Sequence, residues 1–387
     1  MLNKKYFLII VCVTIVIKIF LFLFAEIHDP KSKFLQDSAS YLETGKILIS
    51  KGVFAFRDTN GSLHHEFRRT PGYPLFLGVL HGALEIPLGG VVFIQILLTI
   101  LTALLVYKTA MLIDPELAFL SAGMVLCSPV IFIYSMMILT EPLFLFFITL
   151  FMFYFVRYME SGGIKFLIIS SLMLVLAAYV RPGGYFLGAA IAAFVVYANV
   201  THDMKKAIWH AFVLLAVVYG LLGIWQLRNY MDFKNPTFCI IFQEDSGFYK
   251  NYPGNAGLFA GIMGQLQYYS RTIFYGLVSL MTRPGSFKYF HCYTLTIFGK
   301  VLGYPWMVFW MGGFLYGITK IGHNRYYQFL MFVIVCFIYG SIIGAIHYLG
   351  GRFRIPMEPF IAIISAYGWQ QLMLFTKARI LVMPRKD

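Results

Sequence analysis

The sequence predicts an all-α, polytopic membrane protein. Of its 387 residues, 59% are hydrophobic, 18% are aromatic and only 12% are charged, which is more apolar side chain than a soluble domain can bury. The hydrophobic residues form unbroken runs of about 20 residues, the length that an α-helix needs to cross a bilayer. Membrane β-barrels instead alternate apolar and polar residues in shorter segments, so we expect the spans to be helices.

Ten apolar runs satisfy this length rule. The first follows Lys4-Lys5 and lacks a convincing small-x-small cleavage motif, so we interpret it as an uncleaved helix and not as a signal peptide. The apolar segment 72–84 is too short to cross, and we expect it to lie along the membrane or dip into it. The predicted spans are residues 6–25, 89–111, 117–135, 142–158, 165–181, 184–200, 207–226, 301–319, 328–347 and 356–375.

The basic residues between these runs predict the orientation. With the N-terminus inside, ten crossings place Lys165, Lys205-Lys206, Lys320 and the basic C-terminal tail in the cytoplasm, as the positive-inside rule requires. We therefore expect a multi-pass protein of the cell inner (cytoplasmic) membrane with both termini cytoplasmic. This asymmetry and anionic headgroups account for the net charge of +14, so membrane lipids are expected partners and nucleic acid is not.

Two long intervals, residues 26–88 and 227–300, then fall on the extracytoplasmic face. Because the chain shows no internal repeat and no low-complexity linker, we expect residues 1–387 to form one domain, with the second interval folded against the first. The second interval contains Cys239 and Cys292. The sequence leaves open whether these two cysteines form a disulfide or pack as free thiols.

The first interval contains a carboxylate that is a candidate for catalysis. Asp37 follows the first span closely, where an acid can also simply cap the next helix. Its surroundings favour chemistry, because the extracytoplasmic turns carry more arginine than orientation requires, and arginine binds phosphate oxygens two at a time. A base beside such groups predicts transfer of a group from a phosphate. The further candidates on this face are Arg68, Arg69, Glu141, Arg181, Arg352 and Arg354.

The arginines also have structural interpretations. Arg68 and Arg69 could anchor the chain at lipid headgroups. Arg352 and Arg354 could end a helix pair at the interface, but alternate positions on an extended turn would point both side chains the same way, and we favour a functional role.

Two other groups are weaker candidates. Glu141 precedes a helix that begins with proline, where an acid stabilises the positive end of the helix dipole. The neighbouring His64 and His65 have no further ligand at a known metal spacing. We therefore predict no metal.

Four motifs, in this order, resemble the C-type glycosyltransferase (GT-C) superfamily. They are Asp37 near the start of the first extracytoplasmic loop, the run 69–74 (RTPGYP) before the short apolar segment, the turn 139–144 (LTEPLF), and the run 352–360 (RFRIPMEPF). The chain looks most like the bacterial branch related to protein O-mannosyltransferases and the lipid A aminoarabinose transferase.

This resemblance implies transfer of a sugar from a polyprenyl-phosphate donor to a lipid, polysaccharide or protein acceptor at the outer face of the membrane, usually with inversion. Asp37 matches the family's acidic residue and would be the general base, and Glu141 would be a second catalytic residue that orients donor or acceptor. No cofactor is implied, and the absence of an Asp-x-Asp motif argues against an essential metal. The candidate donor-phosphate ligands are Arg68, Arg69, Arg352 and Arg354.

Two other functions remain as alternatives. A secondary transporter or lipid flippase usually shows internal repeats and charges inside its helices, and both are scarce here. The charge at Lys18, near the outer end of the first span, is expected to snorkel to the interface. A glycan polymerase or ligase would use a pyrophosphate-linked donor and is also rich in extracytoplasmic arginine, but the Asp37 loop favours a monophosphate donor.

Overall fold

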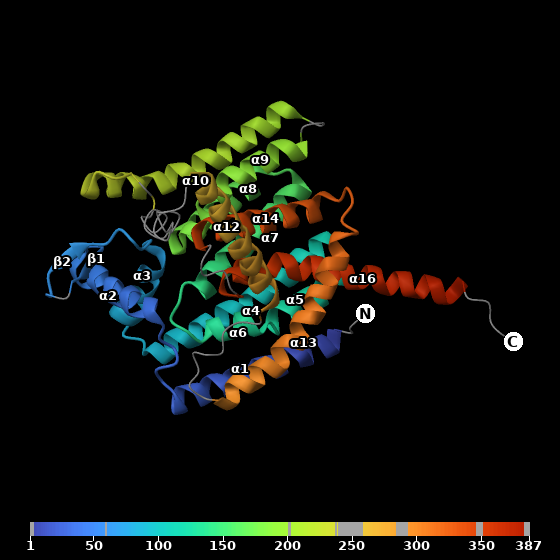
Figure 1. Ribbon diagram of the computed structural model, residues 1–387, viewed down its shortest axis with the longest axis horizontal. Helices are drawn as coiled ribbons and strands as arrows, with labels where there is room; N and C mark the ends of the chain where they lie inside the picture. The colour runs from blue at the N-terminus through green and yellow to red at the C-terminus, as the bar shows by residue number, and fades with distance from the viewer. Residues whose placement is uncertain are drawn as a thin grey trace.

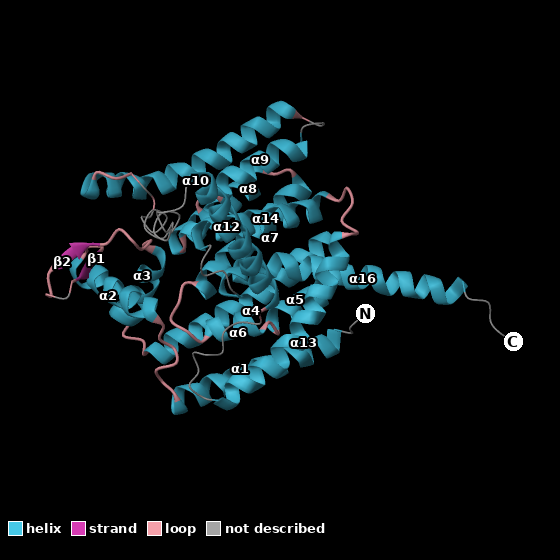
Figure 2. Cartoon of the chain, viewed as in Figure 1, coloured by secondary structure: helices cyan, strands magenta, loops and turns pink. Residues whose placement is uncertain are grey.

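The protein is a bundle of long helices with a two-stranded ribbon at one end (Figure 2). A computed structural model describes residues 4–58, 60–199, 203–236, 238, 258–283, 293–345 and 351–382. Cys239 and Cys292 lie outside these residues, so the question of their pairing stays open.

The first polar interval forms a small unit at one end of the bundle. It contains helix α2 (Gln36–Lys51), an antiparallel ribbon of β1 (Ala55–Arg57) and β2 (Leu63–His65), and helix α3 (Gly72–Leu77), which continues as a π-helical turn Gly78–Ala83. Both chain ends lie away from this unit (Figure 1). The other helices are α1 (Lys4–His28), α4 (Leu88–Ile113), α5 (Ala118–Leu126), α6 (Pro129–Ser135), α7 (Glu141–Ser161), α8 (Ile164–Val180), α9 (Leu187–Asn199), α10 (Met204–Phe233), α12 (Leu258–Thr282), α13 (Tyr293–Ile318), α14 (Arg325–Ala345), α15 (Gly351–Arg354) and α16 (Glu358–Val382).

The predicted fold class is confirmed, and helices lie at all ten predicted spans. By length and composition, six helices in the described part of the chain can cross a membrane, or seven if α5 and α6 form one span bent by 49°. Helix α8 is apolar but shorter, at 17 residues. The number of ten crossings therefore stays a prediction, while the polytopic helical architecture is established.

Helices α2 and α3 touch through glycines. A Cβ atom at Gly45 would lie 2.5 Å from the carbonyl oxygen of Pro74, and one at Gly78 would lie 2.5 Å from the carbonyl oxygen of Gly45. Because glycine has no side chain, the two backbones can approach this closely. The segment 72–83 is too short to cross a bilayer, and its contact with α2 fixes the helix that carries Asp37.

An aromatic core fixes the helices that carry the later candidate residues. Helix α7 packs against α4 and α8, and α16 packs against α13 and α14. The buried rings of Phe155 on α7 and Phe329 on α14 stack with centroids 4.4 Å apart, and such a pair adds about 0.5–1.5 kcal/mol beyond burial alone. The N-terminus of α7, with Glu141, is thereby held beside the segment that precedes α16.

Lys18 does not snorkel, so that expectation was wrong. Its side chain on α1 is 2% exposed, and Nζ lies 5.6 Å from the ring centroid of Phe132 on α6. Among the described residues, Nζ has no hydrogen-bond partner. The prediction failed because it treated α1 as a helix facing lipid, whereas α1 packs against α5 and this part of it is covered by protein.

Candidate active site

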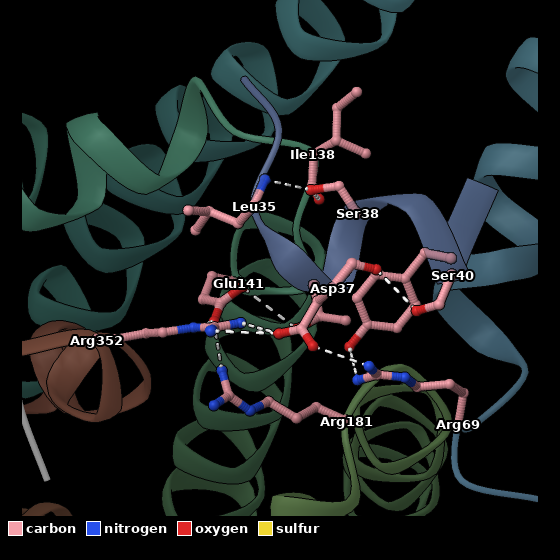
Figure 3. Close-up of polar contacts among 11 residues, drawn as sticks. Leu35, Asp37, Ser38, Ser40, Arg69, Ile138, Glu141, Arg181 and Arg352 are labelled. Atoms are coloured by element: carbon pink, nitrogen blue, oxygen red, sulfur yellow. Dashed lines mark hydrogen bonds and ion pairs between the residues drawn. The ribbon is translucent and has the colours of Figure 1, made fainter. Parts of the chain in front are cut away.

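Five charged side chains from distant parts of the sequence meet beside the first turn of α2 (Figure 3). Asp37 lies in that turn, Glu141 begins α7, Arg181 follows α8, Arg352 lies on α15, and Arg69 lies in the loop before α3. This charged cluster therefore joins residues from all four motifs that the sequence analysis singled out, namely Asp37, Arg69, Glu141 and Arg352.

Asp37 is held by two guanidinium groups. Its Oδ1 accepts a hydrogen bond of 2.8 Å from Nη2 of Arg69. Its Oδ2 lies 3.3 Å from Nη2 and 3.4 Å from Nη1 of Arg352. The Asp37 side chain is 30% exposed, so the carboxylate remains accessible while both of its oxygens are neutralised.

Glu141 organises the inner side of the cluster. Its side chain is 1% exposed, and its Oε1 accepts a 2.8 Å hydrogen bond from Nη1 of Arg181 and a further one from Nε of Arg352. Arg352 thus contacts both carboxylates, using Nε toward Glu141 and its two Nη atoms toward Asp37. Only a guanidinium has donors in this fork geometry.

Local contacts hold Asp37 in its place. The Ser38 hydroxyl accepts a hydrogen bond from the backbone N–H of Leu35 and donates one of 2.9 Å to the carbonyl oxygen of Ile138. Gly52, at a φ of +68°, ends α2 in the left-handed conformation. The start of α2 is thereby tied to the turn before α7, which carries Glu141.

The loop that carries Arg69 is fixed from within. The buried carboxylate of Glu66 accepts hydrogen bonds from the backbone N–H groups of Arg68 at 2.6 Å and Arg69 at 3.3 Å. The Thr70 hydroxyl donates to the carbonyl oxygen of Val180 at 3.2 Å. The same loop is therefore anchored to the C-terminal end of α8, next to Arg181.

The balance of charge in the cluster is positive. Three guanidinium groups face two carboxylates, which leaves one net positive charge. Burial raises the pKa of Asp37, but the charge and hydrogen bond of Arg69 and the charge of Arg352 outweigh it, so the pKa lies below its ordinary value. Asp37 is consequently ionised at neutral pH, and the cluster attracts anions.

Tyr41 completes the cluster and was not predicted from the sequence. Its hydroxyl accepts a 3.1 Å hydrogen bond from Nη1 of Arg69, whose guanidinium carbon also lies 4.7 Å from the ring centroid. Burial raises the pKa of the Tyr41 hydroxyl, which keeps it protonated. The pattern that could have found it is its position four residues after Asp37, one turn along the same helix face.

Two predicted phosphate ligands lie apart from the cluster. Arg68 is exposed on the surface, and its backbone N–H donates a hydrogen bond to the carboxylate of Glu66. Arg354 is 1% exposed and contacts Glu358 on α16 at 2.7 Å and the carbonyl oxygen of Leu280 on α12 at 2.7 Å. The structure thus brings Arg69 and Arg352 to Asp37 but directs Arg354 toward packing between helices.

No metal site is evident among the residues that the structure describes, in which no group of three or more His, Cys, Asp or Glu side chains could hold an ion. His64 instead contacts Asp58 at 3.0 Å, and His65 contacts Asp232 at 2.9 Å. Whether the reaction needs a divalent cation is not tested by this arrangement, so the metal-free reaction stays a prediction.

Comparisons with known proteins agree with this architecture. Residues 69–225 match the family described as dolichyl-phosphate-mannose-protein mannosyltransferase. The curated proteins give no match. The family match covers the loop with Arg69, the turn with Glu141 and the helices between them, but not Asp37 or Arg352.

Solved structures share the fold. One is the archaeal oligosaccharyltransferase AglB from Archaeoglobus fulgidus in complex with an inhibitory peptide and a dolichol-phosphate, with 15% identity, a TM-score of 0.56, and coverage of 99% of this chain and 53% of that one. Another is ArnT from Cupriavidus metallidurans in the apo state, with 13% identity, a TM-score of 0.59, and coverage of 98% and 62%. The chain thus spans between half and two thirds of these proteins' lengths.

The resemblance predicted from the sequence is confirmed by these comparisons. Residues 69–225 resemble the mannosyltransferase family, and the fold of the chain is that of AglB and ArnT.

Proposed function

We propose that this GT-C type membrane glycosyltransferase transfers a sugar from a polyprenyl-phosphate donor to a hydroxyl of an acceptor at the outer face of the cytoplasmic membrane. The observation that carries the proposal is the bridging of Asp37 by Arg69 and Arg352, which lie 32 and 315 residues away in the sequence. A carboxylate that is partly exposed and flanked by guanidinium groups provides a base and a phosphate site side by side.

The donor phosphate would compete with Asp37 for the arginines. Guanidinium groups bind phosphate oxygens as readily as carboxylate oxygens, so an entering phosphate takes contacts of Arg69 and Arg352 that now go to Asp37. These are the contacts that lower the Asp37 pKa. Donor binding therefore raises this pKa and makes Asp37 a stronger base at the moment when a base is needed.

The transfer itself is a single displacement. The acceptor hydroxyl gives its proton to Asp37 as its oxygen forms a bond to the anomeric carbon of the sugar. The bond from that carbon to the phosphate oxygen breaks on the opposite face, and the electron pair leaves with the phosphate. Arg69 and Arg352 neutralise the charge that develops on the leaving phosphate, and attack from the face opposite the leaving group inverts the anomeric carbon.

Glu141 would act through the arginines. Its carboxylate is buried and already contacts Arg181 and Arg352, so contact with an acceptor is less suited to it than holding these two guanidinium groups in place. We therefore assign Glu141 as a positioning residue and Arg181 as a further source of positive charge. This refines the expectation that Glu141 orients donor or acceptor directly.

The sidedness of the site rests on the loops. The cluster lies at the end of the bundle formed by α2 and the ribbon, and both termini point away from that end (Figure 1). The positive-inside rule assigns the termini to the cytoplasm. Together these two observations support an extracytoplasmic active site.

The replacement of Asp37 by asparagine tests the proposal. Loss of a general base lowers turnover by about 10²–10⁴-fold, whereas the neutral amide keeps the arginines available, so we expect donor binding to be retained or tightened. The assay uses purified protein in lipid nanodiscs with polyprenyl-phosphate sugars and measures both sugar release and donor affinity. Asp203→Asn is the matched control, because Asp203 caps the far end of α10 and asparagine preserves that cap.

The outcomes separate the competing functions. Unchanged turnover in Asp37→Asn contradicts the proposed mechanism. A wild-type protein that uses only pyrophosphate-linked donors is a polymerase or ligase, and one that moves lipid across the membrane in both variants without releasing sugar is a transporter or flippase.

A further inference from the structure

A cavity outside the charged cluster lies between the ribbon and the C-terminal end of α10. Its volume is about 370 Å³, within the range of sites that hold small ligands. Aromatic rings line it together with imidazole and carboxylate groups, and the proposed reaction uses none of them. The residues that matter are Phe56, His64, His65, Phe67, Asp232 and Phe233.

The aromatic wall is partly exposed and preformed. The rings of Phe67 and Phe233 have centroids 5.0 Å apart at an interplanar angle of 60°. Phe233 is further fixed by Arg228, whose guanidinium carbon lies 5.3 Å from its ring centroid. Rings held at an angle present flat apolar surfaces to a ligand without having to reorganise.

The polar wall presents hydrogen-bond acceptors. Nδ1 of His65 at 2.9 Å and Nε of Arg228 at 3.0 Å both contact Oδ2 of Asp232, and Oδ1 accepts no hydrogen bond from the described residues. When Nδ1 of His65 carries the proton that faces Asp232, its Nε2 is an acceptor. The cavity thus favours ligands that donate hydrogen bonds, such as hydroxyl groups, over phosphates.

The cavity is adjacent to the charged cluster. Phe67 lines the cavity and Arg69 contacts Asp37, and their Cα atoms are at most roughly 7 Å apart because they lie two positions apart along the chain. Glu66 joins the two sites: its carboxylate holds the N–H of Arg69, and its carbonyl oxygen accepts a 2.8 Å hydrogen bond from Arg228. The loop 66–69 therefore connects the cavity directly to the cluster that holds the candidate base.

We propose that this cavity binds a saccharide unit of the acceptor and so directs a nearby hydroxyl toward Asp37. The proposal rests on the proposed function, since it names the chemical class of the acceptor. Pyranose rings combine apolar C–H faces with hydroxyl donors, which matches angled rings beside carboxylate and imidazole acceptors. A peptide would instead be expected to pair along a strand edge through its backbone, and the cavity is lined by side chains.

Direct binding tests the proposal without relying on catalysis. Saturation-transfer NMR measures ligand binding to the full-length protein in nanodiscs. The ligands are four disaccharides (maltose, cellobiose, mannobiose and chitobiose) and a matched set of four hydroxyl-containing peptides. We expect at least one disaccharide to bind, and its affinity to fall about tenfold in Asp232→Asn and in Phe233→Leu, as for loss of a hydrogen bond to a charged group or of an aromatic contact. The controls on the same helix are Asp203→Asn and Phe212→Leu, and Phe212 is exposed away from the cavity.

The outcomes distinguish this proposal from the proposed function. Disaccharide binding that survives in Asp37→Asn but is lost in Asp232→Asn supports the cavity even if that Asp37 variant retains full turnover. Binding of none of the four disaccharides, preference for the peptides, or equal affinity in Asp232→Asn, Phe233→Leu and the controls overturns it. Matching thermal unfolding of all variants excludes misfolding as the cause of lost binding.

Discussion

Arg352 is the residue whose replacement tests the charged cluster most sharply. Its Nε faces Glu141 while its two Nη atoms face Asp37, so one side chain links both carboxylates. Arg352→Lys keeps the positive charge but replaces the planar fork by a single ammonium group, which cannot hold both carboxylates in this geometry. Arg352→Gln removes the charge as well and leaves the carboxylates to Arg69 and Arg181.

The expected magnitudes follow from these contacts. Losing one charge-assisted hydrogen bond costs about 1.5–3 kcal/mol, so Arg352→Lys should weaken kcat/KM for the donor by about 10–150-fold. Arg352→Gln should cost more, because two neighbouring carboxylates then lose a shared cation. It should also raise the pKa of Asp37, since Arg352 is one of the charges that lower it.

The pH dependence gives this prediction its sign. The base form of Asp37 exists above its pKa, so activity falls as the pH drops through that value. A higher pKa in Arg352→Gln therefore moves the acidic limb of the kcat/KM profile toward higher pH, while Arg352→Lys leaves it close to the wild-type position. The measurement is a pH profile of sugar release in nanodiscs. Full activity in Arg352→Lys, or an unmoved acidic limb in Arg352→Gln, would refute the assignment of this cluster as the donor site.

Three further changes test the arrangement elsewhere. Tyr41→Phe removes the hydroxyl that accepts a hydrogen bond from Arg69. Losing this hydrogen bond costs about 1 kcal/mol and should raise the donor KM several-fold at unchanged thermal stability. A donor KM equal to that of the wild type would contradict this prediction. Lys18→Met removes a buried amine that has no hydrogen-bond partner among the described residues. Because an unpaired buried charge is costly, Tm should rise. A lower Tm would mean that the amine has a partner. Arg354→Met breaks a buried ion pair with Glu358, which costs about 3–5 kcal/mol of stability. We expect Tm to fall while the folded protein keeps its donor affinity. Loss of donor affinity at full stability would instead indicate a role in the site.

The sequence was sufficient to predict the helical architecture because hydrophobic length is a local property. Each predicted span corresponds to a helix, and the short segment 72–84 was expected not to cross. The break between α5 and α6 was not predicted, although Ser128-Pro129 marks it in the sequence, because proline disfavours a helical conformation in the residue before it. Apolar composition reports the membrane environment and is insensitive to such bends.

The candidate site was partly predictable for a different reason. Asp37, Arg69 and Arg352 were selected because charges outside the membrane in an apolar chain need an explanation. The contact of Arg69 with Tyr41, the burial of Glu141 and the role of Arg181 depend on how α2, α7 and α8 meet. No pattern within one segment records that packing, so these contacts were found only in the folded chain.

The two arginines of the run 352–354 show how local conformation decides function. On an extended chain, residues two apart point the same way, and on that assumption both were expected at the phosphate. Residues 351–354 instead form the helical turn α15, where a step of two residues rotates the side chain by about 200°. Arg352 accordingly faces Asp37 and Glu141, while Arg354 reaches the carbonyl oxygens of Leu280 and Arg283 at the end of α12. The same turn therefore holds the charged cluster on one side and the end of α12 on the other.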